Sequence, residues 1–202
     1  MPIVDLEPAA HRLAGLVAGV PDTVLEGPTP CPDYRVGDLV EHIGGLALAF
    51  TDAATRTMGE AGGQGPSGDA TRLAPDWRAQ IPADLAGLAR SWQRPDAWTG
   101  MTRVGGIDLP GETAGMFALD ELVVHGWDLA RATGQDYDVE ASSLEPLMDL
   151  LVPFSEPGRE AARTGLFGPV IPVAADAPLL DRVLGLTGRD PGWTPDRRPQ
   201  SI

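Results

Sequence analysis

The sequence predicts an all-α protein: a four-helix bundle with a small β-hairpin and a C-terminal extension rich in proline and glycine. Four long segments place apolar residues three and four positions apart, which is the period of an amphipathic helix. One short segment around two consecutive glycines has the pattern of paired strands. With 202 residues, 43% of them hydrophobic, the chain is long enough for one domain with a core and short for two.

The four long helices are separated by residues that cannot continue them. Pro21 follows the first, and Gly134 suits the position just after the last. The connector 27–33 holds three prolines, each of which fixes φ and disfavours helix in the residue before it. We expect the helices at about residues 3–20, 36–56, 75–93 and 112–133.

The remaining segments are shorter. The pair Gly105–Gly106 predicts a hairpin over about residues 98–109. Residues 59–68 are rich in glycine and predict a surface loop. Two further helical pieces are expected at about 141–152 and 178–186. The chain is thus expected to form a single domain over 1–202, with a core at about 3–152 and a C-terminal extension at about 153–202.

The charge of the chain argues against two classes of partner. It has 29 acidic and 15 basic side chains, a net charge of −14. Such a surface repels phosphate, so neither nucleic acid nor an anionic membrane is an expected partner. No apolar run approaches the roughly 18–20 residues that cross a bilayer, and the N-terminus does not have the pattern of a signal peptide. Cys31 is the only cysteine, and together these features predict a cytoplasmic protein.

The helix over 112–133 is apolar on nearly every side, so it is expected to be buried. At about 100° per residue, His125 lies some 40° from Glu121, and Asp128 lies about 20° on the other side. These three ionisable side chains therefore form one stripe, whereas Asp120 faces elsewhere. Ala114, Ala118 and Ala132 lie on the same stripe and leave space in front of it.

A metal ion would explain ionisable groups in a buried helix, because imidazole and carboxylate are both good ligands for zinc and its neighbours. Side chains four residues apart can reach one ion. A third ligand is needed, and His42 lies at the edge of an apolar stripe, whereas His11 lies in a less apolar setting. The predicted ligands are therefore His42, Glu121 and His125.

Two histidines and one carboxylate leave an open position on the ion, which is typical of a catalytic zinc site. Asp128 and Asp38 are candidates to accept hydrogen bonds from the ligand imidazoles. Simpler interpretations stay open. Glu121 and His125 could form an internal ion pair, His42 could be a core histidine, and Asp128 could pair with Arg131. Cys31, between prolines, is interpreted as a packed connector residue and not as a nucleophile.

Three stretches of the chain resemble a known family. Residues 28–42 read PTPCPDYRVGDLVEH, and residues 121–134 read ELVVHGWDLARATG. The tail segment 181–193, which reads DRVLGLTGRDPGW, adds to the likeness. The chain resembles the actinobacterial mycothiol-dependent maleylpyruvate isomerase-like group, which belongs to the DinB-like metalloprotein superfamily.

The resemblance implies a DinB-like four-helix bundle with one divalent metal ion, usually zinc and sometimes nickel in recombinant material. The family's His, Glu and His ligands correspond to His42, Glu121 and His125. In thiol-dependent members, mycothiol binds the open metal position and attacks a small electrophilic substrate. The characterised isomerase has an added C-terminal domain, and residues 135–202 are too short for a full copy. The resemblance therefore does not carry over maleylpyruvate as the substrate.

Three functional hypotheses follow. The first is a metal- and thiol-dependent transferase or isomerase, and the second is a metal-binding bundle without turnover, such as a sensor or stress-response protein. The third is a helical interaction protein with an internal ion pair. The sequence leaves both monomer and homodimer open.

Overall fold

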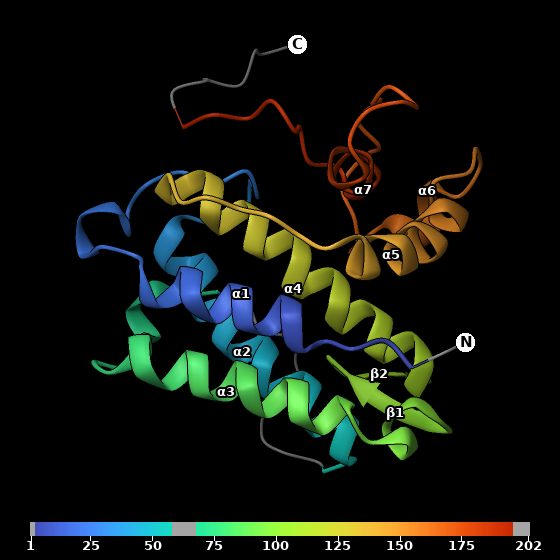
Figure 1. The fold of residues 1–202 in the computed structure, drawn as a ribbon, viewed down its shortest axis with the longest axis horizontal. Coiled ribbons are helices and arrows are strands. Elements are labelled where there is room, and N and C mark those ends of the chain that lie inside the picture. The colour runs from blue at the N-terminus through green and yellow to red at the C-terminus, as the bar shows by residue number, and fades with distance from the viewer. Residues whose placement is uncertain (1–2, 58–67, 196–202) are drawn as a thin grey trace.

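The four predicted long helices form and pack together as a bundle in the computed structural model, which describes residues 3–57 and 68–195 (Figure 1). The helices of the bundle are α1 (Glu7–Ala18), α2 (Val36–Thr55), α3 (Trp77–Trp92) and α4 (Gly111–Thr133). Both α1 and α2 pack on α3 and on α4. The core lies where the apolar stripes of these helices meet.

Helix α4 is the most enclosed element, as its apolar sequence predicts. It is covered by α1, by α2 and by α5 (Ala141–Phe154), and 16 of its 23 residues are buried. The helix ends at Gly134, whose φ of 69° is the left-handed conformation that glycine adopts without strain. Asp120, His125 and Asp128 of this helix therefore lie inside the protein and need partners there.

Helix α1 begins four residues later than predicted, at Glu7. Pro8 lies in its first turn, where the missing N–H of proline is not needed, so the helix starts beside it. Before Glu7, Leu6 is only 1% exposed and Val4 packs against the core, whereas Ile3 is 49% exposed. Val4 and Leu6 are therefore apolar because they pack against the core and not because they belong to a helix, and Ile3 lies outside the core.

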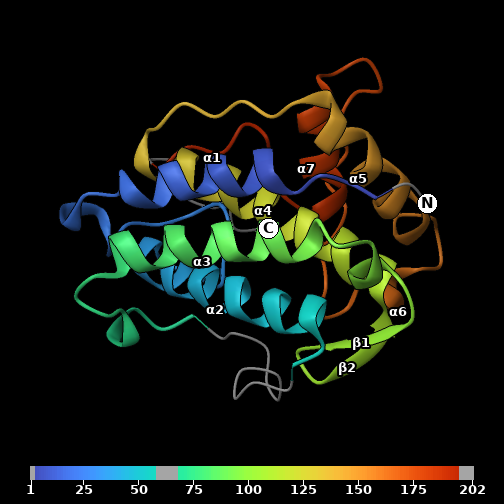
Figure 2. The ribbon, with the colours of Figure 1, turned by 60° about the horizontal axis from the view of Figure 1, so that its bottom comes forward.

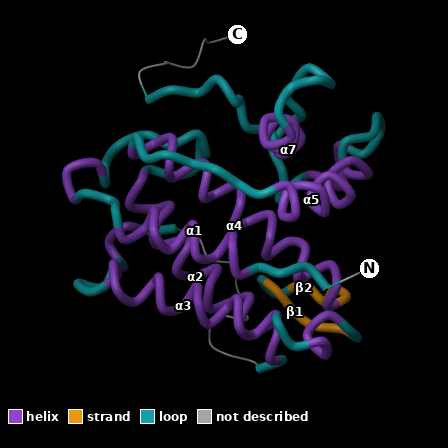
Figure 3. Tube along the Cα trace, in the orientation of Figure 1, coloured by secondary structure: helices purple, strands orange, loops and turns teal. Residues whose placement is uncertain are grey.

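The predicted hairpin forms from β1 (Met101–Val104) and β2 (Ile107–Pro110), which pair antiparallel (Figure 3). Gly105 and Gly106 have φ of 55° and 82°, the two positive values that a tight two-residue turn requires. The Thr102 hydroxyl donates to the carbonyl oxygen of Ala53 at 2.6 Å. This hydrogen bond attaches the hairpin to the C-terminal end of α2.

The C-terminal extension lies on the α4 side of the bundle, away from α3 (Figure 1 and Figure 2), and contains more helix than predicted. The chain continues from α5 into α6 (Glu160–Arg163) and α7 (Leu179–Thr187). Helix α7 packs on α5, and Val183 and Leu184 of α7 have no exposed surface. The described residues also contain four short helical segments that the sequence does not predict, since three or four residues are too few to show a period: α6, η1 (Asp22–Val24), η3 (Ala70–Arg72) and η4 (Pro95–Trp98).

Two other expectations concern loops and membranes. The predicted glycine-rich loop at 59–68 lies, apart from Gly68, outside the described residues. Within residues 3–57 and 68–195, no helix combines the length and the apolar character needed to span a bilayer.

The packing around Gly115 gives a test of the fold. A Cβ atom there would lie 2.6 Å from the Trp98 ring and 2.9 Å from the Trp92 ring. The two indoles are held in place, because Trp92 Nε1 donates to a Phe50 carbonyl and Trp98 Nε1 donates to the Trp92 carbonyl. We expect Gly115→Ala to lower the free energy of unfolding by about 1–3 kcal/mol, measured by urea denaturation.

Gly15→Ala is the matched control for this substitution. It also lies within a helix, but a Cβ atom at Gly15 has no neighbour within 4 Å. Alanine should there raise the free energy of unfolding by up to about 1 kcal/mol through its helix propensity. Equal effects of the two substitutions would contradict the packing of α4 on the tryptophan pair.

Candidate metal centre

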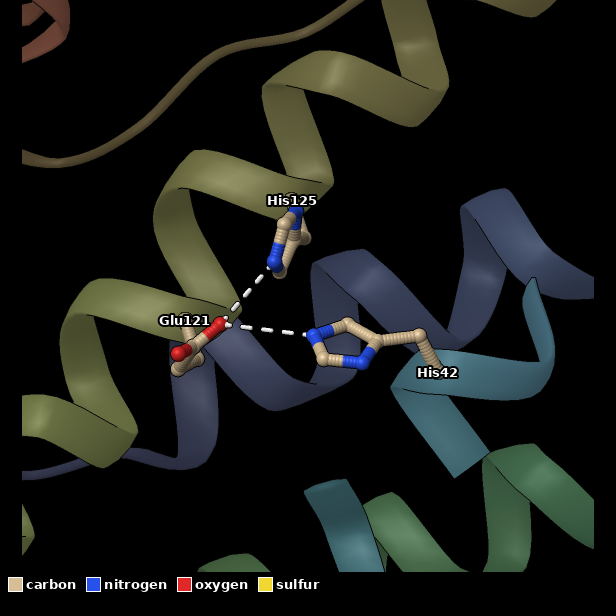
Figure 4. A group of neighbouring side chains, drawn as sticks. All are labelled: His42, Glu121 and His125. Carbon is tan, nitrogen blue, oxygen red and sulfur yellow. Dashed lines mark ion pairs between the residues drawn. The ribbon is translucent and has the colours of Figure 1, made fainter. Parts of the chain in front are cut away.

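Three side chains from two helices point toward one another inside the bundle: His42 from α2 and Glu121 and His125 from α4 (Figure 4). One potential ligand atom from each lies within 4.8 Å of the others. Glu121 Oε2 is 2.9 Å from His125 Nε2 and 4.0 Å from His42 Nε2. Both imidazoles therefore present the same ring nitrogen, Nε2, to a common point beside the carboxylate.

The positions of these residues on α2 and α4 explain why the three side chains lie close together. Glu121 and His125 are four residues apart on α4 and so lie one above the other on one face. His42 lies on the buried face of α2 between Leu39 and Ile43, both at most 1% exposed, and α2 packs directly on α4. The side chains of His42 and His125 are about nine-tenths buried, whereas that of Glu121 is 33% exposed. The site is therefore open to solvent on the carboxylate side.

The ring of His125 is held from behind by Asp128. The Nδ1 atom of His125 lies 3.0 Å from Asp128 Oδ2, and Asp128 has no exposed surface. Because an ionised carboxylate only accepts hydrogen bonds, His125 carries its proton on Nδ1 and directs Nε2 toward Glu121. Asp128 also forms an ion pair with Arg189, and not with Arg131, which donates to the carbonyl oxygen of Trp193.

The ring of His42 is approached from behind by Tyr34, whose hydroxyl lies 3.2 Å from His42 Nδ1. Burial raises the pKa of Tyr34 to about 12, so the hydroxyl keeps its proton at neutral pH. The proline-rich connector positions this residue: the Thr29 hydroxyl donates to the carbonyl oxygens of Cys31 and Tyr34, both at 2.8 Å. No spacing in the sequence predicts this role for Tyr34, although it lies within the segment 28–42 that carries the family resemblance.

Asp38, the other predicted acceptor for an imidazole, is engaged at the start of α2. Its Oδ2 atom accepts from the Arg35 N–H at 3.2 Å, and its Oδ1 atom accepts from the Ala70 N–H at 3.0 Å. A carboxylate in the first turn of a helix is drawn to free backbone N–H groups there. Asp38 therefore fixes the entry of α2 and the segment around Ala70, and Tyr34 occupies the position behind His42.

Two other predicted features lie near the site. Burial raises the pKa of the Cys31 thiol to about 11, so this buried cysteine stays protonated and unreactive at neutral pH. Of the three stripe alanines, Ala118 lines a small cavity of about 10 Å³ together with Glu121. That volume is close to the space one water molecule needs.

Asp120, which the helical wheel turns away from the stripe, is buried as the apolar sequence of its helix predicts. It is only 6% exposed, and its Oδ1 atom has no hydrogen-bond partner among the described residues. Burial and the neighbouring charge of Glu121 raise its pKa to about 7. The raised pKa favours the neutral form of the Asp120 side chain over the ionised form.

The charges of the other groups are coupled. Burial alone would lower the pKa of His125, but its hydrogen bonds to Asp128 and Glu121 outweigh burial and raise the pKa to about 9. Burial would raise the pKa of Glu121, but the hydrogen bond from His125 and the charges of both histidines hold it below its usual value. Without a metal ion, His125 therefore carries a proton that bridges to Glu121.

The donor set and its spacing fit a divalent metal ion. Ligand atoms bound at about 2.1 Å in a tetrahedral arrangement lie roughly 3.4 Å apart. The two distances from Glu121 Oε2, 2.9 Å and 4.0 Å, lie on either side of that value. Two imidazoles and one carboxylate suit zinc and neighbouring transition metals, and they leave a coordination position free.

Comparison with known proteins places the chain in a family. Two uncharacterized proteins, from two strains of Mycobacterium tuberculosis, are each 29% identical to it over 140 residues, 69% of this chain and 71% of each relative. A crystal structure of a mycothiol-dependent maleylpyruvate isomerase matches its fold with a TM-score of 0.53 and 16% identity. That match covers 72% of this chain and 65% of the isomerase chain, so the protein spans less than two thirds of the isomerase's length.

The family model provides the assignment. The model of the mycothiol maleylpyruvate isomerase N-terminal domain matches residues 6–130, which is more than half of the chain. The matched segment contains all four bundle helices up to the last turn of α4, and with them His42, Glu121, His125 and Asp128. The resemblance seen in the sequence and the predicted fold class are both confirmed, and the chain belongs to the mycothiol maleylpyruvate isomerase N-terminal domain family.

Proposed function

We propose that this protein binds one divalent metal ion, zinc in its native state, through His42, Glu121 and His125, and uses it to activate a low-molecular-weight thiol. The thiol that the family name suggests is mycothiol. The reaction is a transfer to, or an isomerisation of, a small electrophile such as an activated alkene or an epoxide. The observation that carries the proposal is the convergence of two Nε2 atoms on one carboxylate.

The residues around the site suit an anionic ligand in the open position. Glu121 is the only anionic member of the proposed ligand set, so it cancels only half the charge of a divalent ion. The charge of Asp128 is already balanced by Arg189. A divalent ion bound here would stabilise a thiolate, although a free thiol has a pKa near 8.5 and is mostly protonated at neutral pH.

Residues around the proposed site orient the ligand imidazoles and determine where a thiol can approach. Tyr34 and Asp128 hold the two imidazoles from behind, so both Nε2 atoms keep their direction when a ligand binds. Cys31 stays protonated, so the nucleophile must come from a bound thiol. The exposed third of the Glu121 side chain marks the side from which that thiol can reach the site.

A metal-binding bundle without turnover is the second candidate, and the cavity beside Glu121 favours it. Its volume of about 10 Å³ does not admit an organic substrate without movement of its apolar lining, which includes Leu46 and Leu122. A sensor or stress-response protein would need no larger space. Turnover with a thiol and an electrophile separates the two candidates.

The first prediction from the proposal concerns metal content. Protein purified without chelator should contain about one divalent ion per chain by elemental analysis. His125→Ala should lose most of it, because one ligand and the support from Asp128 are removed together. His11→Ala is the control, since His11 is exposed on α1, and its metal content should equal that of the wild type. Full metal retention in His125→Ala would refute the assignment.

The second prediction concerns pH. The pKa of His125 is raised to about 9 in the metal-free protein, so a proton must leave this side chain when a metal ion binds below that pH. Between pH 7 and 9, the apparent metal affinity should therefore rise by about tenfold per pH unit, and the rise should end above pH 9. Competition with a chromophoric chelator measures this dependence. An affinity that does not change over this range would show that metal binding displaces no proton with a pKa near 9.

The third prediction concerns the thiol. Mycothiol added to the cobalt-substituted protein should produce a sulfur-to-cobalt charge-transfer band. The band should persist in Cys31→Ser, because the buried thiol of Cys31 is not its source, and it should be lost in His42→Ala. If no band appears, and a panel of thiol-acceptor substrates shows no turnover above His42→Ala, the protein is a metal-binding bundle without this activity.

A further inference from the structure

Arg189 reaches the site from the far end of the chain. Helix α7 ends at Gly188, whose φ of 87° turns the backbone, and the Arg189 N–H donates to the carbonyl oxygen of Leu184 at 2.9 Å. A side chain at position 188 has no room, since a Cβ atom would lie 2.7 Å from Gly168 Cα and 2.9 Å from the Pro169 carbonyl oxygen. The end of α7 is thus fixed by its own backbone, and the next side chain is directed to α4.

The guanidinium of Arg189 holds Asp128 by two nitrogens. Its Nε atom lies 3.1 Å from Asp128 Oδ1 and 3.2 Å from Oδ2, and its Nη2 atom lies 3.0 Å from Oδ2. Asp128 has no exposed surface, and the Arg189 side chain is only 12% exposed. Oδ2 is the oxygen that also lies 3.0 Å from His125 Nδ1. One carboxylate therefore joins a proposed metal ligand to the C-terminal extension.

Asp128 needs the contact with Arg189 because its carboxylate is buried. A carboxylate without solvent and without a cation is strongly destabilised, and the planar fork of arginine satisfies both its oxygens in a fixed orientation. With Asp128 fixed in this way, the hydrogen bond to Nδ1 sets both the plane of the His125 ring and its tautomer. A carboxylate free to rotate would let the ring turn and would move Nε2 away from Glu121 and His42.

We propose that Arg189 is a positioning residue of the metal centre: it orients Asp128, which in turn orients His125. The C-terminal extension is thereby part of the construction of the site, although the family model that contains the ligands ends at residue 130. This inference rests on the proposed metal site. It concerns how the ligand is held and adds no step to the reaction.

Arg163 offers a matched control, because it fastens the same extension without contacting Asp128. Its Nη2 atom donates to the carbonyl oxygens of Gly168 and Leu186, and its Nη1 atom donates to the Ser155 hydroxyl at 3.2 Å. Like Arg189, it is largely buried and bonds to the segment around α7. A purely structural effect of loosening the extension should therefore appear in Arg163→Met as strongly as in Arg189→Met.

The test measures cobalt affinity, the visible spectrum of the cobalt protein and the melting temperature. Arg189→Met should weaken cobalt binding by about 10–100-fold and change the spectrum, because the ligand ring is displaced. Arg189→Lys keeps the charge but loses the fork, so its affinity should lie between those of Arg189→Met and the wild type. Arg163→Met should lower the melting temperature and leave cobalt affinity within about twofold of the wild type.

A double-mutant cycle shows whether Arg189 acts through Asp128. If it does, Arg189→Met should weaken cobalt binding no further once Asp128→Asn is present, whereas independent effects would add. If Arg189→Met does not fold, Arg189→Lys decides the question against Arg163→Met.

Equal loss of affinity in the Arg189 and Arg163 variants, additive effects in the cycle, or wild-type affinity in a folded Arg189 variant would each overturn the inference and leave the proposed metal site intact. A wild-type protein that binds no cobalt would overturn the proposed function and this inference with it.

Discussion

The carboxylate of Asp128 has no contact with solvent, and it lies on a helix whose surroundings are almost wholly apolar. An ionised group in that position is stable only with charged or hydrogen-bonding partners, and it has two: His125 on one side and Arg189 on the other. The hydrogen bond between Asp128 and His125 directs the His125 imidazole toward Glu121. The ion pair with Arg189 requires that the turn after α7 lie against α4. The candidate site and the C-terminal extension thus both depend on keeping this one charge paired.

The imidazoles of His42 and His125 are oriented by different parts of the chain. His125 is supported from its own helix, three residues on, and further from the extension. His42 is approached by Tyr34, which the proline-rich connector carries to the start of α2. Both Nε2 atoms face Glu121, so a metal ion bound at the proposed site would require little rearrangement of these side chains.

The sequence predicts those parts of the site whose spacing is local. Glu121 and His125 are four residues apart on one helix, which predicts that they lie together, and the apolar stripe of α2 distinguishes His42 from His11. Contacts that are long-range or that compete with the backbone cannot be predicted in this way. Arg189 is 61 positions from Asp128, and no periodicity links them. Asp38 was expected near an imidazole, but the free N–H groups at the start of α2 and at Ala70 take its carboxylate.

The family match ends within α4, but the interactions that stabilise α4 reach into the C-terminal extension. The segment that matches the family model ends two residues after Asp128, whereas the cation that balances Asp128 comes from beyond α7. Removing one partner of a buried ion pair costs about 3–5 kcal/mol, because the remaining charge keeps its desolvation penalty and loses its compensation. That is a sizeable share of the roughly 5–15 kcal/mol by which a typical protein is stable. Without Arg189, Asp128 would share the charge of His125 with Glu121. The extension, despite its many prolines and glycines, therefore contributes to the stability of the helix that carries the candidate ligands.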